Sequence, residues 1–313
     1  MKRRAAAKLP PAANGMTLLA YLSGRFDYHS SAEWQQRINN GELTLNGTVC
    51  CDPDIGLQCG MLLEYNPQNL IEPAVNSNYN IVYEDDFLLV IDKPGNLPVH
   101  PAGPYFAHTL WALLQESGHA AVHFVNRLDR ETSGLLIAAK DSRTAGELAK
   151  TLPDMRKQYY VLVHGVFENP ICARGFLSTD TTSTIRKKQL FTAGTTPPDG
   201  AGKFFEVETA FKPLQSNDFY TLLSAELHTG RMHQIRATLH GMGFPVVGDK
   251  LYGLDEQFYR RFALGILDEN DRRQLRLERQ ALHCSELSFV HPIDNKVMTF
   301  HSKLPPEIAA LLG

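Results

Sequence analysis

The sequence predicts an α+β chain in two folded parts, a small N-terminal α+β module and a larger domain built on a mixed, mainly antiparallel sheet. Strand-like apolar runs follow one another through the larger part without regular helices between them, which argues against parallel βαβ units. The 313 residues, 43% of them hydrophobic, suffice for one sizeable core and a small one. We divide the chain into a basic tail at 1–15, a module at 16–65, a linker at 66–79 and a main domain at 80–313.

The N-terminal module is predicted to consist of two helices followed by a hairpin. The second helix begins at a capping box that runs from Ser30 to Glu33, and it ends at Gly41. The pair Asn46-Gly47, between two short apolar runs, is typical of a tight hairpin turn.

The segments on either side of this module are expected to lack regular structure. Residues 1–15 are basic without the apolar core of a signal sequence, which favours a disordered tail over an arm that contacts nucleic acid. Residues 66–79 are rich in Asn and Pro and have no periodicity, so they are predicted to be an interdomain linker.

The main domain is expected to contain most of the strands. A helix is predicted at 142–150, and another starts near Arg231 and runs to Met242. Residues 177–203 are polar and rich in Thr, Gly and Pro, so we expect a long loop. The charged segment 255–280 is expected to form an exposed helical excursion. Runs of β-branched, aromatic and other apolar residues predict strands at 81–83, 87–91, 135–139, 159–167, 204–211 and 219–227.

Composition bounds the class of protein. No apolar run approaches the roughly 18 residues of a membrane span, so no membrane partner is expected. The five cysteines lack the Cys-x-x-Cys spacing of a zinc site, which favours reduced thiols in a cytoplasmic protein. The net charge of −3 does not indicate a nucleic-acid binder, so RNA binding would depend on local basic clusters.

The most informative run is 125–137, in which Asp129 lies between Arg127 and Arg130. A turn of small residues and an apolar strand follow the carboxylate. Positive neighbours keep a carboxylate ionised and able to attack, and guanidinium groups suit a phosphate-rich substrate. Taken alone, such a tetrad is also typical of a solvated surface turn.

The longer string Asn126-Arg127-Leu128-Asp129-Arg130-Glu131-Thr132-Ser133-Gly134-Leu135 resembles the catalytic motif of the RluA-like pseudouridine synthases, where a His usually stands in place of Asn126. Residues 16–65 resemble the αL RNA-binding module first seen in a small-subunit ribosomal protein. The resemblance of the main domain covers residues 80 to 305. Further matches follow in the family's order: Asp92-Lys93-Pro94-Gly95, Lys157-Gln158-Tyr159, Thr229-Gly230-Arg231-Met232-His233-Gln234-Ile235-Arg236, Pro245-Val246-Val247-Gly248-Asp249 and Gln280-Ala281-Leu282-His283.

The resemblance implies a catalytic domain of pseudouridine synthase type that isomerises uridine in RNA without a cofactor or a metal. Asp129 matches the family's catalytic aspartate, and Tyr159 matches its active-site tyrosine. Arg231 matches an arginine thought to hold the aspartate ionised. Arg127 matches an arginine that enters the space vacated by a flipped nucleotide.

Further residues are assigned to RNA binding or to the protein interior. The side chains expected to contact RNA besides Arg127 are Arg130, Lys157, Arg236 and, in the module, Arg37. Glu131 is expected to face solvent. His233 and His240 are expected to be structural or hydrogen-bonding residues, because no carboxylate partner completes a metal site.

The target and the chemical route stay open. Large-subunit ribosomal RNA is expected from the combination of module and catalytic domain, with transfer RNA as the alternative. A glycosylase that releases the base, and a non-catalytic RNA-binding or ribosome-assembly protein, are the other hypotheses. Asp129 can attack the sugar, attack the base or assist loss of a sugar proton. We expect a monomer.

Overall fold

The computed structural model describes residues 5–26, 29–67, 72–199 and 202–313. They divide into two compact units. The first comprises Met1–Ala74 with His100–Ala112, and the second comprises Val75–Val99 with Leu113–Gly313. Within the described residues, no helix has both the length and the apolar character needed to cross a bilayer.

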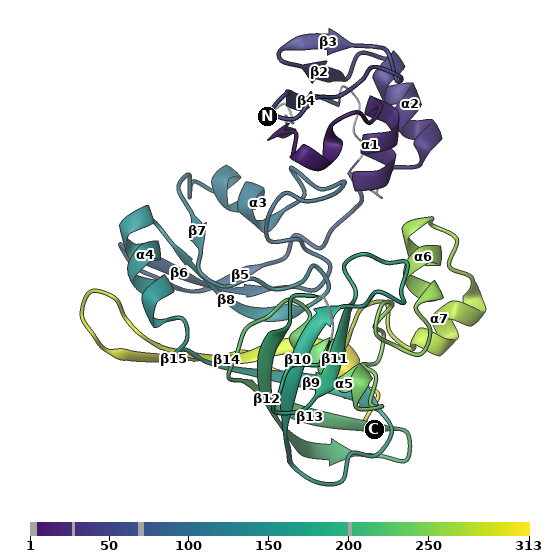
Figure 1. Cartoon of the computed structure of the whole chain (residues 1–313). Helices are drawn as coiled ribbons and strands as arrows, with labels where there is room; N and C mark the ends of the chain where they lie inside the picture. Colours follow the sequence, from purple (N-terminus) through teal and green to yellow (C-terminus); the bar gives the residue numbers. More distant parts are fainter. Residues whose placement is uncertain (1–4, 27–28, 68–71, 200–201) are drawn as a thin grey trace. The chain divides into compact units, whose positions relative to one another are not determined.

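The N-terminal unit packs two short helices against a four-stranded sheet. Trp34 and Ile38, one turn apart on the second helix, are both buried in its hydrophobic core. Ser30 and Glu33 form the capping box that the sequence predicts. The elements, labelled in Figure 1, are β1 (Ala5–Lys8), η1 (Pro11–Ala13), α1 (Leu18–Arg25), α2 (Ser31–Asn39), β2 (Leu43–Leu45), β3 (Thr48–Cys50) and β4 (Leu62–Tyr65), with strand order β1-β4-β2-β3.

The predicted hairpin is confirmed, whereas the predicted tail differs from the structure. Asn46 and Gly47 both have positive φ, 51° and 82°, as a tight primed turn requires. Strand β1 lies within the segment expected to be a disordered tail and pairs antiparallel with β4. Leu9 and Ala13, which follow it, are buried in the core. β1 covers an edge of β4 that would otherwise be unpaired, so the described part of the tail belongs to the module.

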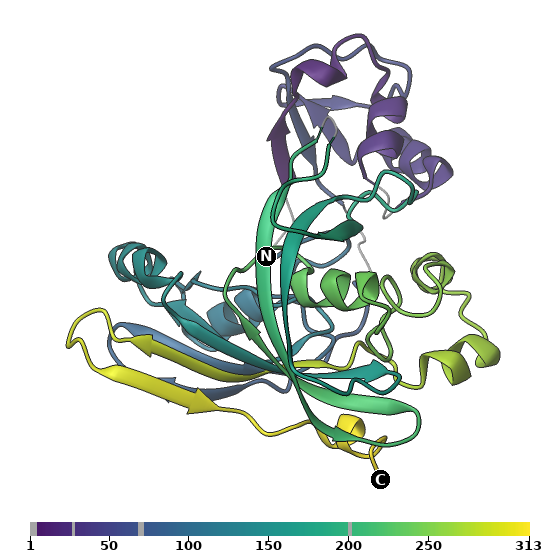
Figure 2. The same cartoon turned by 60° about the horizontal axis from the view of Figure 1, so that its bottom comes forward.

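The larger unit is built on one twisted sheet of 11 strands, drawn in Figures 1 and 2. All of its strand pairings are antiparallel except one short parallel contact between β8 and β14, so the predicted sheet type is confirmed. The strands are β5 (Asn80–Glu84), β6 (Leu88–Lys93), β7 (His123–Phe124), β8 (Ser133–Ala139), β9 (Arg156–His164), β10 (Ile171–Thr179), β11 (Gln189–Ala193), β12 (Phe205–Ser216), β13 (Tyr220–Leu227), β14 (Leu282–Val290) and β15 (Val297–His301).

The order of the sheet is β11-β10-β12-β13-β9-β14-β8-β6-β5, with β15 paired to β14 and β7 paired to β8. The segment 177–203, which was predicted to be a loop, contains the end of β10 and the whole of β11. The two strands pair with each other. The polar, Thr-rich composition of that segment hides β11, which is short and lies at the edge of the sheet. β14 and β15, yellow in Figure 2, were not assigned from the sequence.

The helices of the chain outside the N-terminal module are short. Asp141 caps α4 by accepting a hydrogen bond from the backbone N–H of Thr144 (2.8 Å), and α4 confirms the helix predicted at 142–150. The helical excursion predicted at 255–280 is present as α6 and α7. These helices are α3 (Leu110–Glu116), α4 (Ser142–Thr151), α5 (Gln234–Gly241), α6 (Gln257–Ala263), α7 (Glu269–Leu275) and α8 (Pro306–Ala309).

Gly134 allows the close approach of β8 and β14. All seven residues of β8 are buried, and the parallel contact pairs Gly134 with Cys284. Gly134 has φ +104°, and a Cβ built there would lie 2.2 Å from the carbonyl oxygen of Cys284. The strand that follows the 125–132 segment is therefore held in place at a position that tolerates no side chain.

We predict that Gly134→Ala lowers the free energy of unfolding by at least about 2 kcal/mol, because it adds both a steric clash and backbone strain. Urea unfolding followed by circular dichroism measures the change. Gly146→Ala in α4 is the matched control, because a Cβ at Gly146 would meet no atom within 4 Å. Since Ala is more stable than Gly inside a helix by about 0.5–1 kcal/mol, this variant should lose no stability. Equal losses in the two variants would contradict the role given to Gly134.

Candidate active site

Asp129 presents one oxygen that is held and one that is free. It lies between β7 and β8, on a turn closed by a hydrogen bond from the Thr132 N–H to its carbonyl (3.1 Å). Oδ2 accepts hydrogen bonds from Arg236 Nη1 (2.7 Å) and Gln280 Nε2 (3.4 Å). Oδ1 accepts no hydrogen bond within the described ranges, and His233 Nε2 is 3.9 Å away. The side chain is 32% exposed, so a substrate can reach it.

Arg236 is fixed on both edges and on its face. Asp249 accepts hydrogen bonds from its Nε (2.6 Å) and its Nη2 (2.8 Å). Asp249 is fully buried and also accepts from the backbone N–H groups of Leu251 and Tyr252, both at 2.9 Å. The Tyr252 ring centroid is 5.0 Å from the guanidinium carbon. The guanidinium therefore lies between two carboxylates and against an aromatic ring, with no freedom to swing away.

The arginine that pairs with Asp129 is Arg236, and the predicted pairing of Arg231 with Asp129 is wrong. Arg231 is exposed, and its guanidinium carbon lies 5.2 Å from the centroid of the Phe205 ring. The reason is where the helix begins. α5 starts at Gln234, whose side chain accepts from the backbone N–H of Arg231 (3.0 Å). Arg231 thus precedes the helix, whereas Arg236 lies on its buried face.

The charge of Asp129 follows from its neighbours. Burial raises the pKa of Asp129, but the charge that His233 carries in acid, the charge of Arg236, and hydrogen bonds from Arg236 and Gln280 outweigh it and hold that pKa well below the usual range. Burial lowers the pKa of His233 to about 4, so His233 is uncharged at neutral pH. Arg236 is then the cation that keeps Asp129 ionised.

His233 and Tyr252 form the second half of this network. Tyr252 Oη accepts a hydrogen bond from the backbone N–H of Gln189 (2.8 Å) and lies 2.9 Å from His233 Nδ1. The hydroxyl hydrogen is then available for Nδ1 of the neutral imidazole, which leaves the Nε2–H on the side of Asp129. His233 is a hydrogen-bonded residue, as predicted, and His240 Nδ1 bonds the Tyr252 carbonyl (3.0 Å).

Tyr159 is buried in the sheet of the same unit. It occupies β9, is 6% exposed and pairs across the sheet with Cys284 on β14. Burial raises the pKa of Tyr159 well above its usual value, and the neighbouring Cys284 and Asp129 raise it further. Its hydroxyl is therefore protonated at neutral pH.

Two residues predicted to contact RNA are buried instead. The Lys157 ammonium donates to the Leu152 carbonyl (3.1 Å), and burial lowers the pKa of Lys157. Lys157 shares the inward face of β9 with Tyr159 because the two are two residues apart. Arg236 is held by its two carboxylates. Neither side chain is presented to a phosphate, so both predictions of RNA contact are corrected.

Glu131 was predicted to face solvent, but the structure places it in a network of ion pairs. Its carboxylate accepts from Lys250 Nζ, with both oxygens at 3.1 Å, and from Arg130 Nη2 at 2.7 Å. Its side chain is 13% exposed. Of the other predicted RNA-binding residues, Arg127 is exposed, and Arg37, in the N-terminal unit, pairs with Glu42 at 2.9 Å.

Lys93 anchors the backbone next to Asp129 and was not identified from the sequence. It is fully buried, and Nζ donates to the carbonyls of Pro94 (2.8 Å), Leu97 (2.9 Å) and Arg130 (3.2 Å). Burial, and then the charge of Arg279, lower the pKa of Lys93 to about 7. Three carbonyls match the three N–H donors of an ammonium group. Asp249 and Gln280 stand in segments that match the family, yet nothing in the sequence alone assigns their contacts.

Asn126 binds the backbone of the neighbouring strand. Its Oδ1 accepts from the backbone N–H of Ile137 (2.8 Å). Its Nδ2 is buried and has no hydrogen-bond partner among the described residues. Asn126 thus supports β8 at Ile137 and does not contact the Asp129 carboxylate through any described hydrogen bond.

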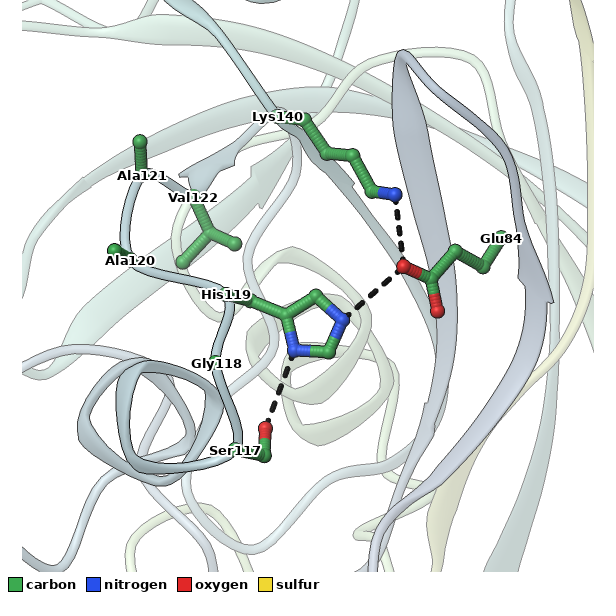
Figure 3. Close-up of a pocket in the computed structure, with 8 residues that line it drawn as sticks. All are labelled: Glu84, Ser117, Gly118, His119, Ala120, Ala121, Val122 and Lys140. Atoms are coloured by element: carbon green, nitrogen blue, oxygen red, sulfur yellow. Dashed lines mark hydrogen bonds and ion pairs between the residues drawn. The ribbon is translucent and has the colours of Figure 1, made fainter.

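A separate pocket of about 340 Å³ lies between β5, β8 and the turn after α3 (Figure 3). There Glu84 Oε1 bonds Lys140 Nζ (2.7 Å) and His119 Nε2 (3.2 Å), and His119 Nδ1 is 3.2 Å from Ser117 Oγ. None of the residues around Asp129 lines it. In the part of the chain that the structure describes, no three His, Cys, Asp or Glu side chains converge as a metal site would require.

We predict that His283 makes stability depend on pH. It is 3% exposed, bonds Ser133 Oγ through Nδ1 (2.9 Å), and burial lowers its pKa to about 4. Between pH 6.5 and 4 the unfolded chain binds a proton that the folded one does not, so up to about 3 kcal/mol of stability is lost on acidification. His283→Asn should lose less stability than wild type between pH 7 and 4.5 in urea titrations. The exposed His301 supplies the control, His301→Asn, which should keep the wild-type slope.

Known proteins resemble this chain over most of its length. Residues 87–241 match the family model described as RNA pseudouridylate synthase. Ribosomal large subunit pseudouridine synthase D of Buchnera aphidicola subsp. Baizongia pistaciae is 30% identical over 303 residues, which cover 93% of this chain and 90% of that protein. An uncharacterized RNA pseudouridine synthase of Synechocystis is 30% identical, with 95% and 88% covered.

A solved structure shares the fold. Human RNA Pseudouridylate Synthase Domain Containing 1 superposes with a TM-score of 0.58, covering 77% of this chain and 90% of that one at 22% identity. The alignments with these two sequence relatives cover nearly the full length of both proteins. Asp129 lies within the segment that the family model matches. The chain therefore belongs to the RluA family of RNA pseudouridine synthases, which are isomerases that act on RNA.

Proposed function

We propose that this enzyme isomerises a specific uridine of large-subunit ribosomal RNA and that Asp129 is its nucleophile. The observation that carries the proposal is the Asp129 carboxylate, ionised by Arg236 at Oδ2 and open at Oδ1. The names of several relatives, ribosomal large subunit pseudouridine synthases D, support the choice of RNA.

The isomerisation needs only what these side chains supply. A carbon–nitrogen glycosidic bond breaks, the uracil turns, and a carbon–carbon bond forms, with no net gain or loss of atoms. The free Oδ1 of Asp129 serves each of the three routes, which are attack at the anomeric carbon, attack on the ring and removal of a sugar proton. The Tyr159 ring, whose hydroxyl is protonated and whose pKa is raised in part by the charge of Asp129, is assigned to hold the detached base.

The exposed arginines are assigned to the nucleic acid. Arg127, two residues before Asp129, suits the position left by a flipped nucleotide, and such flipping costs a few kcal/mol. Arg231 is exposed just before α5, where it suits a backbone phosphate. We extend the proposal to the N-terminal unit as an RNA-binding module, and to the cytoplasm, because all five cysteines are free thiols.

We expect Asp129→Asn to fold and to bind RNA, but to form pseudouridine at least about 10⁴-fold more slowly, because an amide is no nucleophile. Pseudouridine formed in total RNA from a strain lacking the gene is counted by mass spectrometry after carbodiimide labelling. Asp86→Asn makes the same change at an exposed carboxylate and should keep full activity. Activity in Asp129→Asn close to wild type would overturn the assignment.

Mapping of the modified positions tests the target. Loss of a pseudouridine from large-subunit ribosomal RNA on deletion of the gene, restored by wild type and not by Asp129→Asn, is the expected result. A lost position in transfer RNA would replace the proposed target with the alternative one. Release of free uracil would indicate a glycosylase, and no change at any position would favour a non-catalytic RNA-binding protein.

Asn126→His is expected to keep activity within about threefold of wild type. The Nδ1 of a neutral His can occupy the place of the Asn126 Oδ1 and accept the same Ile137 N–H. Asn126→Leu, which has a similar size but no acceptor, leaves that N–H unpaired and should lower the free energy of unfolding by about 1–3 kcal/mol. A large loss of activity in Asn126→His with unchanged stability would show that this position acts in the chemistry.

A further inference from the structure

The loop between β10 and β11 and the helices α6 and α7 form one built lobe, here defined as residues 180–189 and 254–276 (Figure 1). Glu256 holds the loop to the helices, because its carboxylate accepts from Lys188 Nζ (2.7 Å) and Ser183 Oγ (3.0 Å). Arg260 on α6 donates to the hydroxyl of Thr184. The loop is therefore tied to α6 at several points.

The two helices of the lobe are also joined to each other. Arg261 on α6 makes two hydrogen bonds to the buried carboxylate of Asp271 on α7, at 2.7 and 2.9 Å. Phe258 is 1% exposed beneath them. The lobe thus has its own buried contacts and presents a defined surface.

One side of the lobe contacts the loop that carries Asp129. The Phe262 ring on α6 lies 5.0 Å from the Arg130 guanidinium carbon and 4.8 Å from Lys250 Nζ. Both cations bind Glu131, two residues after Asp129. The lobe is therefore continuous with the catalytic loop.

The other side of the lobe reaches the active site through Tyr252. The backbone N–H of Gln189, at the end of the β10–β11 loop, donates to the Tyr252 hydroxyl, which bonds His233. The charge of Lys187 is among those that lower the pKa of His233. The contacts of Phe262 and of Gln189 thus place the lobe beside the segment that carries Asp129 and its partners.

Most carboxylates of the lobe are paired with cations inside it, whereas several of its cations have no carboxylate partner. The pairs are Asp180 and Glu256 with Lys188, Asp271 with Arg261, and Glu269 with Arg273. By contrast, five exposed cations of the lobe, Arg186, Lys187, Arg260, Arg272 and Arg276, form no ion pair within the described ranges. The first three lie on the loop and on α6, the two parts of the lobe that Glu256 holds together. Lys187 instead lies over the Tyr259 ring, 4.3 Å from its centroid.

We propose that Arg186, Lys187 and Arg260 form a phosphate-binding surface for the RNA strand that flanks the target uridine. The inference rests on the RNA substrate of the proposed function and adds the part of the protein that holds the backbone. A uridine drawn to Asp129 brings its neighbouring phosphates beside the lobe, where cations without a carboxylate partner can bind them. Such contacts position the strand and do not read its sequence.

The test compares salt dependence in variants that lack one or two of these charges. Pseudouridine formation in total RNA from a strain lacking the gene is measured for Lys187→Gln, for Arg186→Gln with Lys187→Gln, and for Arg260→Gln. We expect kcat/KM at 0.15 M KCl to fall about 3–10-fold per charge removed, with kcat at saturating RNA unchanged. The slope of log(kcat/KM) against log[KCl] should become shallower by about 0.7 for each cation that no longer binds a phosphate.

Arg273→Gln is the matched control. It removes the same charge from α7 of the same lobe, but its guanidinium already binds Glu269 (2.6 Å) and its side chain is 70% exposed. Its kcat/KM and its salt slope should match wild type. If the three test variants behave like Arg273→Gln, or if they lower kcat without changing the salt slope, the proposed surface is wrong.

The mapped position tests the ribosomal target, and the salt slopes test the phosphate-binding surface, so the two proposals can fail separately. Total RNA contains whatever RNA the enzyme modifies, so the wild type supplies a rate whatever the target is. Mapping the modified position to transfer RNA would reject the ribosomal target, whereas the salt slopes would still decide the role of the lobe. If the test variants keep the salt slope of the wild type and the modified position lies in ribosomal RNA, the phosphate-binding surface is rejected and the ribosomal target is kept.

Discussion

The guanidinium of Arg236 is the group on which the rest of the site depends. It binds the partly exposed Asp129 on one edge and the buried Asp249 on the other. One carboxylate alone would neutralise an arginine, but two leave the trio with a net charge of −1 while His233 is neutral. Asp129 is therefore held ionised without being fully compensated. A carboxylate in that condition suits the role of nucleophile that we propose for it.

The surrounding protein fixes that trio from several sides. Tyr252 covers the guanidinium, orients Asp249 through its backbone N–H and bonds His233 through its hydroxyl. Lys93 ties the backbone that follows Asp129 to a neighbouring loop. Gly134 lets β14 approach β8 and so fixes where that loop ends. Preorganisation of this kind means that no large rearrangement is needed at the moment of reaction.

The strand-like runs along the chain were enough to predict the type of sheet, because they are set by local sequence. The run around Asp129 was enough to single out that carboxylate for the same reason. The sequence could not decide between Arg231 and Arg236 as the partner of Asp129. Both stand in one eight-residue segment, and they differ in that Arg231 precedes helix α5 whereas Arg236 lies within it. The left-handed backbone of His233, φ 58°, places the start of that helix, and spacing alone does not reveal it. The burial of Glu131 depends on Lys250, which is distant in the sequence and meets Glu131 only in the folded chain.

The complete burial of Asp249 bears on when the enzyme first becomes reactive. That carboxylate is satisfied by Arg236 and by two backbone amides, which come together only after α5 and the 249–252 turn have docked. Before that stage no guanidinium fixes the orientation of the Asp129 carboxylate. The arrangement of Asp129, Arg236 and Asp249 is thus a property of the finished molecule, and a nascent or partly denatured chain lacks it.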